Sequence, residues 1–101
     1  MSESVLQRDR LQALLKAFMA ERGNHYHLSK LGFFGSYARN QATAKSDVDI
    51  VFDTEQPNLL MTAMMQQDLE ALLGRQVDIV RLNRYLHPSF RAQIEKEAVY
   101  V

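Results

Sequence analysis

The chain has 101 residues, a formal net charge of zero, 47% hydrophobic and 24% charged residues, and no cysteine. This length suits a single domain over residues 1–101, and the composition is that of a globular protein. Without cysteine there can be no disulfide, thiolate metal site or thiol nucleophile, which fits a cytoplasmic protein, and the balanced charge argues against a nucleic-acid-binding surface.

The first predicted element is an amphipathic helix within residues 8–22. Apolar side chains recur there at helical spacing, and Gly23 is placed to end the helix. Charged residues interrupt the apolar ones, so we expect neither a signal peptide nor a membrane-spanning helix. A short apolar strand follows within LSKLGFFG (28–35). In SYARNQATAKS (36–46), Ser36 is placed to begin a short helical turn, and a polar loop comes after it.

A second strand, a long helix, a third strand and a last short helix complete the predicted order. The second strand is DVDIVF (47–52), and the third is QVDIVRL (76–82). Between them, Asn58 and Gly74 bound a helix in which we expect an apolar stripe to face the core, formed by Met61, Met65, Leu69 and Leu72. Residues 87–101 predict a short helix and then an extended segment.

This order of elements predicts an α/β (α+β) fold, with helices flanking a small mixed sheet. The helix between the second and third strands permits a parallel crossover connection. The connection between the first and second strands contains only a loop and a turn, so either orientation of these two strands is open.

Three aspartates interrupt the apolar strands. Asp47 and Asp49 are two residues apart in a predicted strand, so both side chains point to the same face. Adjacent ionised carboxylates repel, and such hard oxygen ligands suit Mg²⁺, which takes further ligands from the phosphates of a substrate. Asp78 offers a third carboxylate from the next strand. The three aspartates are therefore the predicted metal ligands, and they suffice for two Mg²⁺ ions.

The turn after the first strand is a candidate phosphate site. Where a strand stops at Gly35 and Ser36 and turns toward a helix, backbone N–H groups are free to bind an anion. Gly35 permits a close approach of the phosphate, and the hydroxyl of Ser36 adds a donor. Arg39 lies three residues further on and can contact the same phosphates.

Each of these features alone has an ordinary structural explanation, since a Gly-Ser pair usually forms a turn and an arginine is usually solvated. Their order is more specific: Gly-Ser, then Ala-Arg, then Ser-Asp-x-Asp entering an apolar strand, then Asp-Ile-Val about thirty residues later. With this pattern the chain resembles, over nearly its whole length, the minimal nucleotidyltransferases of the DNA polymerase β superfamily.

The resemblance implies a nucleotidyltransferase fold in which Gly35 and Ser36 bind the triphosphate of ATP. It also implies that Asp47 and Asp49 bind two Mg²⁺ ions and that Asp78 completes the catalytic site. Two positions depart from the family pattern. Asn40 stands where glycine is usual, which matters little because asparagine tolerates unusual backbone angles. Tyr37 stands where arginine is frequent, which affects the expected contacts with the nucleotide.

The resemblance further implies a partner. Family members of this size commonly act as antitoxins of HEPN ribonuclease toxins by transferring AMP from ATP to a tyrosine of the toxin, so we expect a hetero-oligomer with a HEPN-type protein. Two alternatives are a binding antitoxin or assembly subunit with an idle nucleotide site, and a nucleotidyltransferase for RNA or a small molecule that a partner chain completes. No direct binding of nucleic acid or membrane is expected.

Three arginines in the last third of the chain have two interpretations. Arg81, Arg84 and Arg91 lie in a segment without acidic residues before Glu95. They form either a solvated rim or a contact surface for the nucleotide, RNA or an acidic partner.

Overall fold

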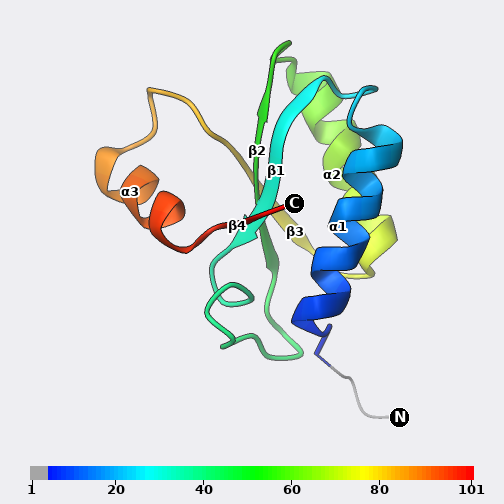
Figure 1. The fold of residues 1–101 in the computed structure, drawn as a ribbon, viewed down its shortest axis with the longest axis vertical. Helices are drawn as coiled ribbons and strands as arrows, with labels where there is room; N and C mark the ends of the chain where they lie inside the picture. Colours follow the sequence, from blue (N-terminus) through cyan, green and yellow to red (C-terminus); the bar gives the residue numbers. More distant parts are fainter. Residues whose placement is uncertain (1–4) are drawn as a thin grey trace.

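A computed structural model of the protein describes residues 5–101, and these residues form a four-stranded sheet with three helices packed around it (Figure 1). In chain order the elements are α1 (Arg8–Arg22), β1 (Leu28–Phe34), β2 (Val48–Thr54), α2 (Leu59–Leu73), β3 (Val77–Arg81), α3 (Pro88–Glu97) and β4 (Val99–Tyr100). The predicted α+β class with a small mixed sheet is confirmed.

The sheet has the strand order β3-β2-β1-β4. Strands β1 and β2 are antiparallel, which settles the orientation that the sequence left open, and β4 is antiparallel to the other edge of β1. The helical crossover through α2 makes β3 parallel to β2, as expected. Because β1 and β2 are central, the turn after β1 and the start of β2 meet at one end of the sheet, beside the start of β3 (Figure 1).

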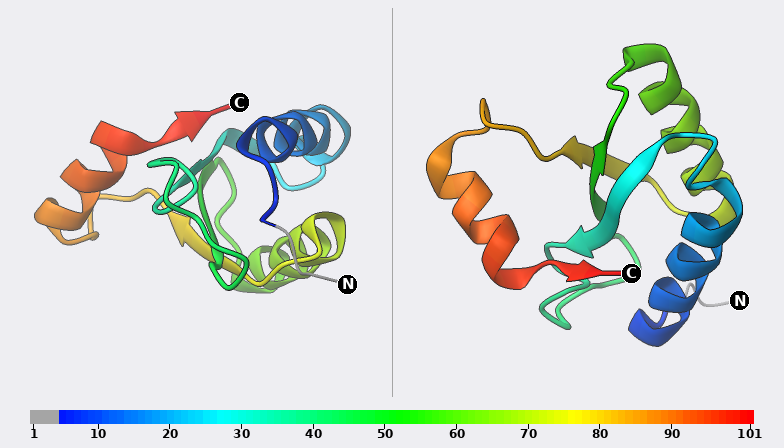
Figure 2. Two further views of the ribbon diagram at one scale, coloured as in Figure 1. Left: turned by 90° about the horizontal axis from the view of Figure 1, so that it is seen from below. Right: turned by 45° about the horizontal axis from the view of Figure 1, so that its top comes forward.

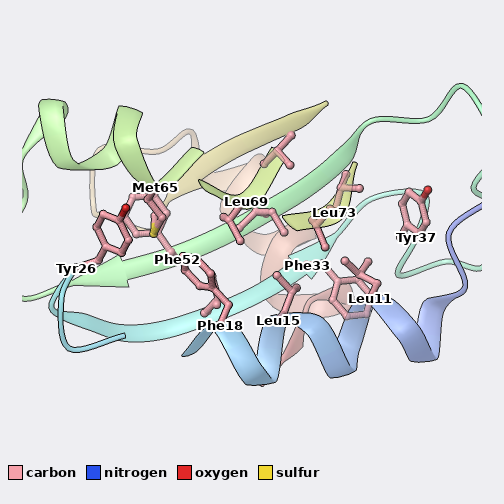
Figure 3. Packing of buried hydrophobic residues seen from close by; sticks show 14 residues of the cluster. Leu11, Leu15, Phe18, Tyr26, Phe33, Tyr37, Phe52, Met65, Leu69 and Leu73 are labelled. Carbon is pink, nitrogen blue, oxygen red and sulfur yellow. The ribbon is translucent and has the colours of Figure 1, made fainter. Parts of the chain in front are cut away.

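The larger core lies between the sheet and the helices α1 and α2, which cover the same face (Figures 2 and 3). Alternate residues of each strand point into it, because successive side chains of a strand face opposite sides. Its fully buried members include Leu11 and Leu15 from α1, Phe33 from β1, Ile50 from β2 and Leu69 from α2.

A smaller apolar cluster holds α3 on the opposite face of the sheet (Figure 2). Ile94 of α3 is fully buried there against Phe34 of β1, Val51 of β2 and Leu82, which follows β3. This face is only partly covered, because α3 is short and lies to one side of the strands (Figure 1). The carboxylates of the strands can therefore reach solvent on this face.

The predicted helix ends of α2 are confirmed. The side chain of Asn58 caps its start by accepting a hydrogen bond from the N–H of Met61 at 3.1 Å. Gly74 ends it in the left-handed conformation, with φ of 66°, which glycine adopts without steric cost. Gly23 follows the last residue of α1, but in the right-handed helical conformation, with φ of −56°.

Three sequence expectations need correction. Residues 35–40 form successive turns, one of which has the helical hydrogen bond from the N–H of Arg39 to the carbonyl oxygen of Gly35, but they do not continue into a helix that Ser36 could begin. Asp47 lies just before β2 and not within it. In the apolar stripe of α2, Leu72 is 42% exposed and Leu73 is buried in its place. Within residues 5–101, no helix combines the length and the apolar character needed to cross a bilayer.

Candidate active site

Asp49 and Asp78 are direct neighbours on adjacent parallel strands. The register of β2 and β3 pairs these two residues, and Val48 and Ile50 on either side of Asp49 are fully buried toward α1 and α2. Since side chains alternate along a strand, both aspartates belong to the opposite face, where α3 lies. Asp47, two residues before Asp49, is exposed at the entrance to β2. The structure thus brings the three predicted carboxylates to one end of the sheet.

The environment of Asp49 disfavours its ionised form. Partial burial is the largest cause that raises the pKa of this carboxyl group above its ordinary value, and the negative charges of Asp78 and Asp47 raise it further. The positive charge of Arg39 opposes the shift, and the charge of Glu97 adds to it. A bound cation would relieve this repulsion, so the chemistry of the donor set fits Mg²⁺. Among residues 5–101, no three His, Cys, Asp or Glu side chains lie so that they could hold a metal ion together, so Asp47, Asp49 and Asp78 do not form a three-carboxylate metal site by themselves. A bound Mg²⁺ would need further oxygen ligands from phosphate or water.

Gly35 is fitted against Asp49. It follows the last residue of β1, and Phe34 before it pairs in register with Asp49 on β2. Its φ is +72°, a conformation that residues with a side chain rarely adopt, and a Cβ added there would lie 2.0 Å from Oδ2 of Asp49. The predicted phosphate turn and the predicted metal ligand are therefore in direct contact.

The turn after Gly35 is tightly organised by its own backbone. The N–H of Arg39 donates to the carbonyl oxygen of Gly35 at 3.1 Å, and the N–H of Gln41 donates to that of Ser36 at 2.8 Å. Asn40 has a φ of +58°, so the position where the family usually has glycine does require a left-handed backbone, as the sequence indicated. Tyr37 is buried in the larger core and points away from the strand aspartates, so it supports the turn.

Glu97 binds two donors of this turn, and the sequence analysis did not identify it as a site residue. Its Oε1 accepts a hydrogen bond from the N–H of Gly35 at 3.2 Å. Nη1 of Arg39 donates to its Oε2 at 2.9 Å and to its Oε1 at 3.2 Å. No sequence signal could have identified Glu97, because it reaches the turn only through the way α3 packs back toward β1.

The structure thus collects Gly35, Arg39, Asp49 and Asp78 at one site, with Asp47 beside them and Ser36 half-buried in the turn. The three arginines at the end of β3 and beyond it do not join them. Arg84 packs over the ring of Tyr85, and Arg91 forms an ion pair with Glu95 at 2.9 Å. Arg81 lines a cavity with Leu59 of α2 instead.

Comparisons with known proteins show the family of the chain. Residues 13–101 match the family described as the nucleotidyltransferase domain. The chain is 35% identical over 99 residues to the protein adenylyltransferase MntA of Thermococcus cleftensis, an alignment that covers 97% of this chain and 99% of the relative.

Solved structures show the same fold. A minimal nucleotidyltransferase superposes with a TM-score of 0.79 at 35% identity, covering 93% of this chain and 95% of the other. A chain from the complex of a tri-AMPylated HEPN toxin of Shewanella oneidensis with an MNT antitoxin has a TM-score of 0.64. It is 21% identical, and the match covers 92% of this chain and 70% of that one, a likeness of fold.

Proposed function

The chain belongs to the nucleotidyltransferase domain family, and we propose that it transfers AMP from ATP to a tyrosine hydroxyl of a HEPN-type toxin protein. In this proposal it acts as the antitoxin of that protein, in the cytoplasm and within a hetero-oligomer. Two similarities support the proposal: the relative in Thermococcus cleftensis is a protein adenylyltransferase, and the fold is shared with a complex that contains an AMPylated HEPN toxin.

The single observation that carries the proposal is the contact of Gly35 with Asp49 beside Asp78. A phosphate bound at the N–H of Gly35 would lie next to two carboxylates, an arrangement that is repulsive unless cations separate them. Enzymes that transfer phosphoryl or nucleotidyl groups use such a combination, because the cations neutralise the phosphates and the developing charge.

In the proposed reaction the acceptor oxygen attacks the α-phosphorus of ATP. A bond forms between that oxygen and the phosphorus, the bond from the phosphorus to the bridging oxygen breaks, and pyrophosphate leaves. Asp78 accepts the proton of the hydroxyl, while the N–H of Gly35, the hydroxyl of Ser36 and the guanidinium of Arg39 hold the phosphates. Magnesium ions held by Asp47, Asp49 and Asp78 would supply charge stabilisation and lower the pKa of the attacking hydroxyl.

Asp78→Asn tests this proposal, because it keeps the shape of the side chain and removes its charge and its ability to accept a proton. We expect the intact mass of a HEPN partner to rise by one or more AMP units with the wild-type chain, ATP and Mg²⁺, and to stay unchanged with Asp78→Asn. Asp53→Asn is the matched control. Asp53 lies on β2 as well, but its Oδ1 accepts a hydrogen bond from the N–H of Thr54 at 2.8 Å, away from the site.

The same variant separates the proposal from a binding antitoxin with an idle site. Co-expression of Asp78→Asn with the toxin should leave cells unprotected if catalysis is required. Full protection by Asp78→Asn, with an unmodified toxin, would refute the transfer reaction and favour neutralisation by contact alone. AMP transfer to RNA or a small molecule, with none to the protein, would point to the second alternative, a nucleotidyltransferase that a partner chain completes.

A further inference from the structure

Two donors of the phosphate turn already bind an anionic group of the protein itself, the carboxylate of Glu97. The carboxylate of Glu97 accepts a hydrogen bond from the N–H of Gly35 at 3.2 Å. Both of its oxygens also accept from Nη1 of Arg39, at 2.9 and 3.2 Å. A carboxylate and a phosphate share the chemistry that this turn recognises, since both present negatively charged oxygens to N–H donors. The side chain of Glu97 is 14% exposed, so it sits within the site and not above it.

The position of Glu97 is otherwise unfavourable for a carboxylate. It is the last residue of α3, where the helix dipole favours a positive charge. Its charge also acts on Asp49, which already faces two other carboxylates. The hydrogen bonds to Gly35 and Arg39 oppose these two repulsions, so the net free energy that holds Glu97 in place is smaller than its three contacts alone imply.

We propose that Glu97 is an internal competitor of the triphosphate, which occupies the place of a phosphate oxygen at Gly35 and Arg39 until a nucleotide displaces it. This inference rests on the proposed function in one respect, that the turn after β1 binds the phosphates of ATP. Displacement requires the Glu97 side chain to turn away from Gly35 and Arg39. It frees one N–H group and one guanidinium, which then bind phosphate oxygens. Glu97 therefore sets the concentration of ATP at which the site fills.

Two substitutions of Glu97 test the proposal by calorimetric titration of the isolated chain with ATP, once with Mg²⁺ and once with EDTA. Glu97→Gln removes the charge and weakens the competing contact, so we expect ATP to bind roughly tenfold more tightly. Glu97→Asp keeps the charge but withdraws the carboxylate by one methylene from Gly35, so it should also bind ATP more tightly than the wild type.

Glu95→Gln is the matched control for the loss of charge. Glu95 lies on the same helix and pairs with Arg91, and it has no contact with the turn. The proposal expects Glu95→Gln to bind ATP as the wild type does. Equal tightening by Glu95→Gln and Glu97→Gln would mean a general electrostatic effect and would overturn the proposal. Weaker ATP binding by Glu97→Gln would also overturn it, because Glu97 would then be a support that positions Arg39 or a ligand of the metal.

The ATP titrations of the Glu97 variants and the assay of AMP transfer to a toxin can fail independently of each other. Tighter ATP binding by both Glu97 variants, with no AMP transfer to a toxin, would uphold the competitor and refute the adenylyltransferase. Normal AMP transfer, with ATP affinity unchanged by both variants, would uphold the adenylyltransferase and refute the competitor. Thermal melts of the three variants would confirm that each is folded during the titrations.

Discussion

Gly35 and Asp49 are packed so closely that no side chain fits between them: a Cβ on Gly35 would lie 2.0 Å from Oδ2 of Asp49. The contact joins the end of β1 to β2 at the point where Asp78 of β3 is in register. The candidate phosphate site and the candidate metal site are therefore in contact at these two residues. A substitution at Gly35 must displace the side chain of Asp49.

Gly35→Ala should abolish measurable ATP binding. The added methyl group must displace the carboxylate of Asp49, and the left-handed backbone at φ of +72° adds strain of about 1 kcal/mol. Titration calorimetry measures the loss. Gly74→Ala is the control, because Gly74 has a similar φ of +66° with nothing within 4 Å of its added Cβ. Gly74→Ala should lose only the stability that the backbone strain costs and keep its ATP affinity. Equal ATP affinity in both variants would contradict a phosphate site at Gly35.

Ser36→Ala should weaken ATP binding only modestly, by several-fold. The hydroxyl of Ser36 is one donor among several, and the backbone N–H groups of the turn remain when it is removed. The same titration measures this change. A loss as complete as that expected for Gly35→Ala would mean that the hydroxyl, and not the backbone, is the main anion contact.

Asp49→Asn should raise the melting temperature of the chain at neutral pH without metal or nucleotide. The pKa of Asp49 is raised in the folded state, chiefly by burial and then by Asp78, so the ionised carboxyl destabilises the fold above that pKa. As the pH falls through the raised pKa toward the unfolded-state value of about 3.9, the wild type takes up a proton and the advantage of the variant disappears.

Melting curves at pH 7.5 and near pH 4 would measure this difference. Asp53→Asn should show no such gain, since Oδ1 of Asp53 accepts a hydrogen bond from the N–H of Thr54. A variant at Asp49 that melts below the wild type at neutral pH would contradict the electrostatic account of the site.

ATP and Mg²⁺ should bind cooperatively. The aspartates leave coordination positions that phosphate oxygens fill, so each ligand completes the site of the other. We expect EDTA to weaken ATP binding about tenfold or more, and ATP to raise the affinity for Mg²⁺ by the same factor, because thermodynamic coupling is reciprocal. In Asp78→Asn the coupling should shrink. An ATP affinity that ignores Mg²⁺ in the wild type would count against a metal site.

The larger core should dominate stability. Leu15 of α1 is fully buried among the side chains of the sheet and α2, so Leu15→Ala should lower the free energy of unfolding by about 3 kcal/mol. Leu60 of α2 is 70% exposed, and Leu60→Ala should change the free energy of unfolding by less than about 0.5 kcal/mol. Urea unfolding of both variants would test this; a similar loss in each would mean that the exposed face of α2 is covered in solution.

Local signals account for the parts of the fold that were predicted correctly. The cap at Asn58, the left-handed Gly74 and the left-handed Asn40 each depend on the conformation of a few consecutive residues. The apolar strands could be found for the same reason, since alternation and branched residues are local properties. The proximity of Asp49 and Asp78 followed from one further assumption, that β2 and β3 are parallel neighbours.

The features that were missed depend on distant packing. The side chain of Leu72 is exposed and that of Leu73 buried because the rotation of α2 against the sheet is set by all its contacts together. Glu97 has no local pattern around it, and its role follows from where α3 ends, next to the turn after β1. Asp47 fell outside β2 because a strand ends where its hydrogen-bonded pairing ends, which the residue types do not specify.

The pairing of β4 with β1 is a long-range contact between the end of the chain and its first strand. Val99 and Tyr100 pair with Phe33 and Gly32, and the N–H of Val101 donates to the carbonyl oxygen of Leu31 at 2.9 Å. These contacts close a loop that contains most of the chain, so their entropic cost is recovered only after β1, β2 and β3 have associated. Amide exchange of Val101 should therefore proceed through a local opening of α3 and β4, well below the free energy of global unfolding. Since Glu97 joins these two elements, each such opening also lifts its carboxylate from the turn.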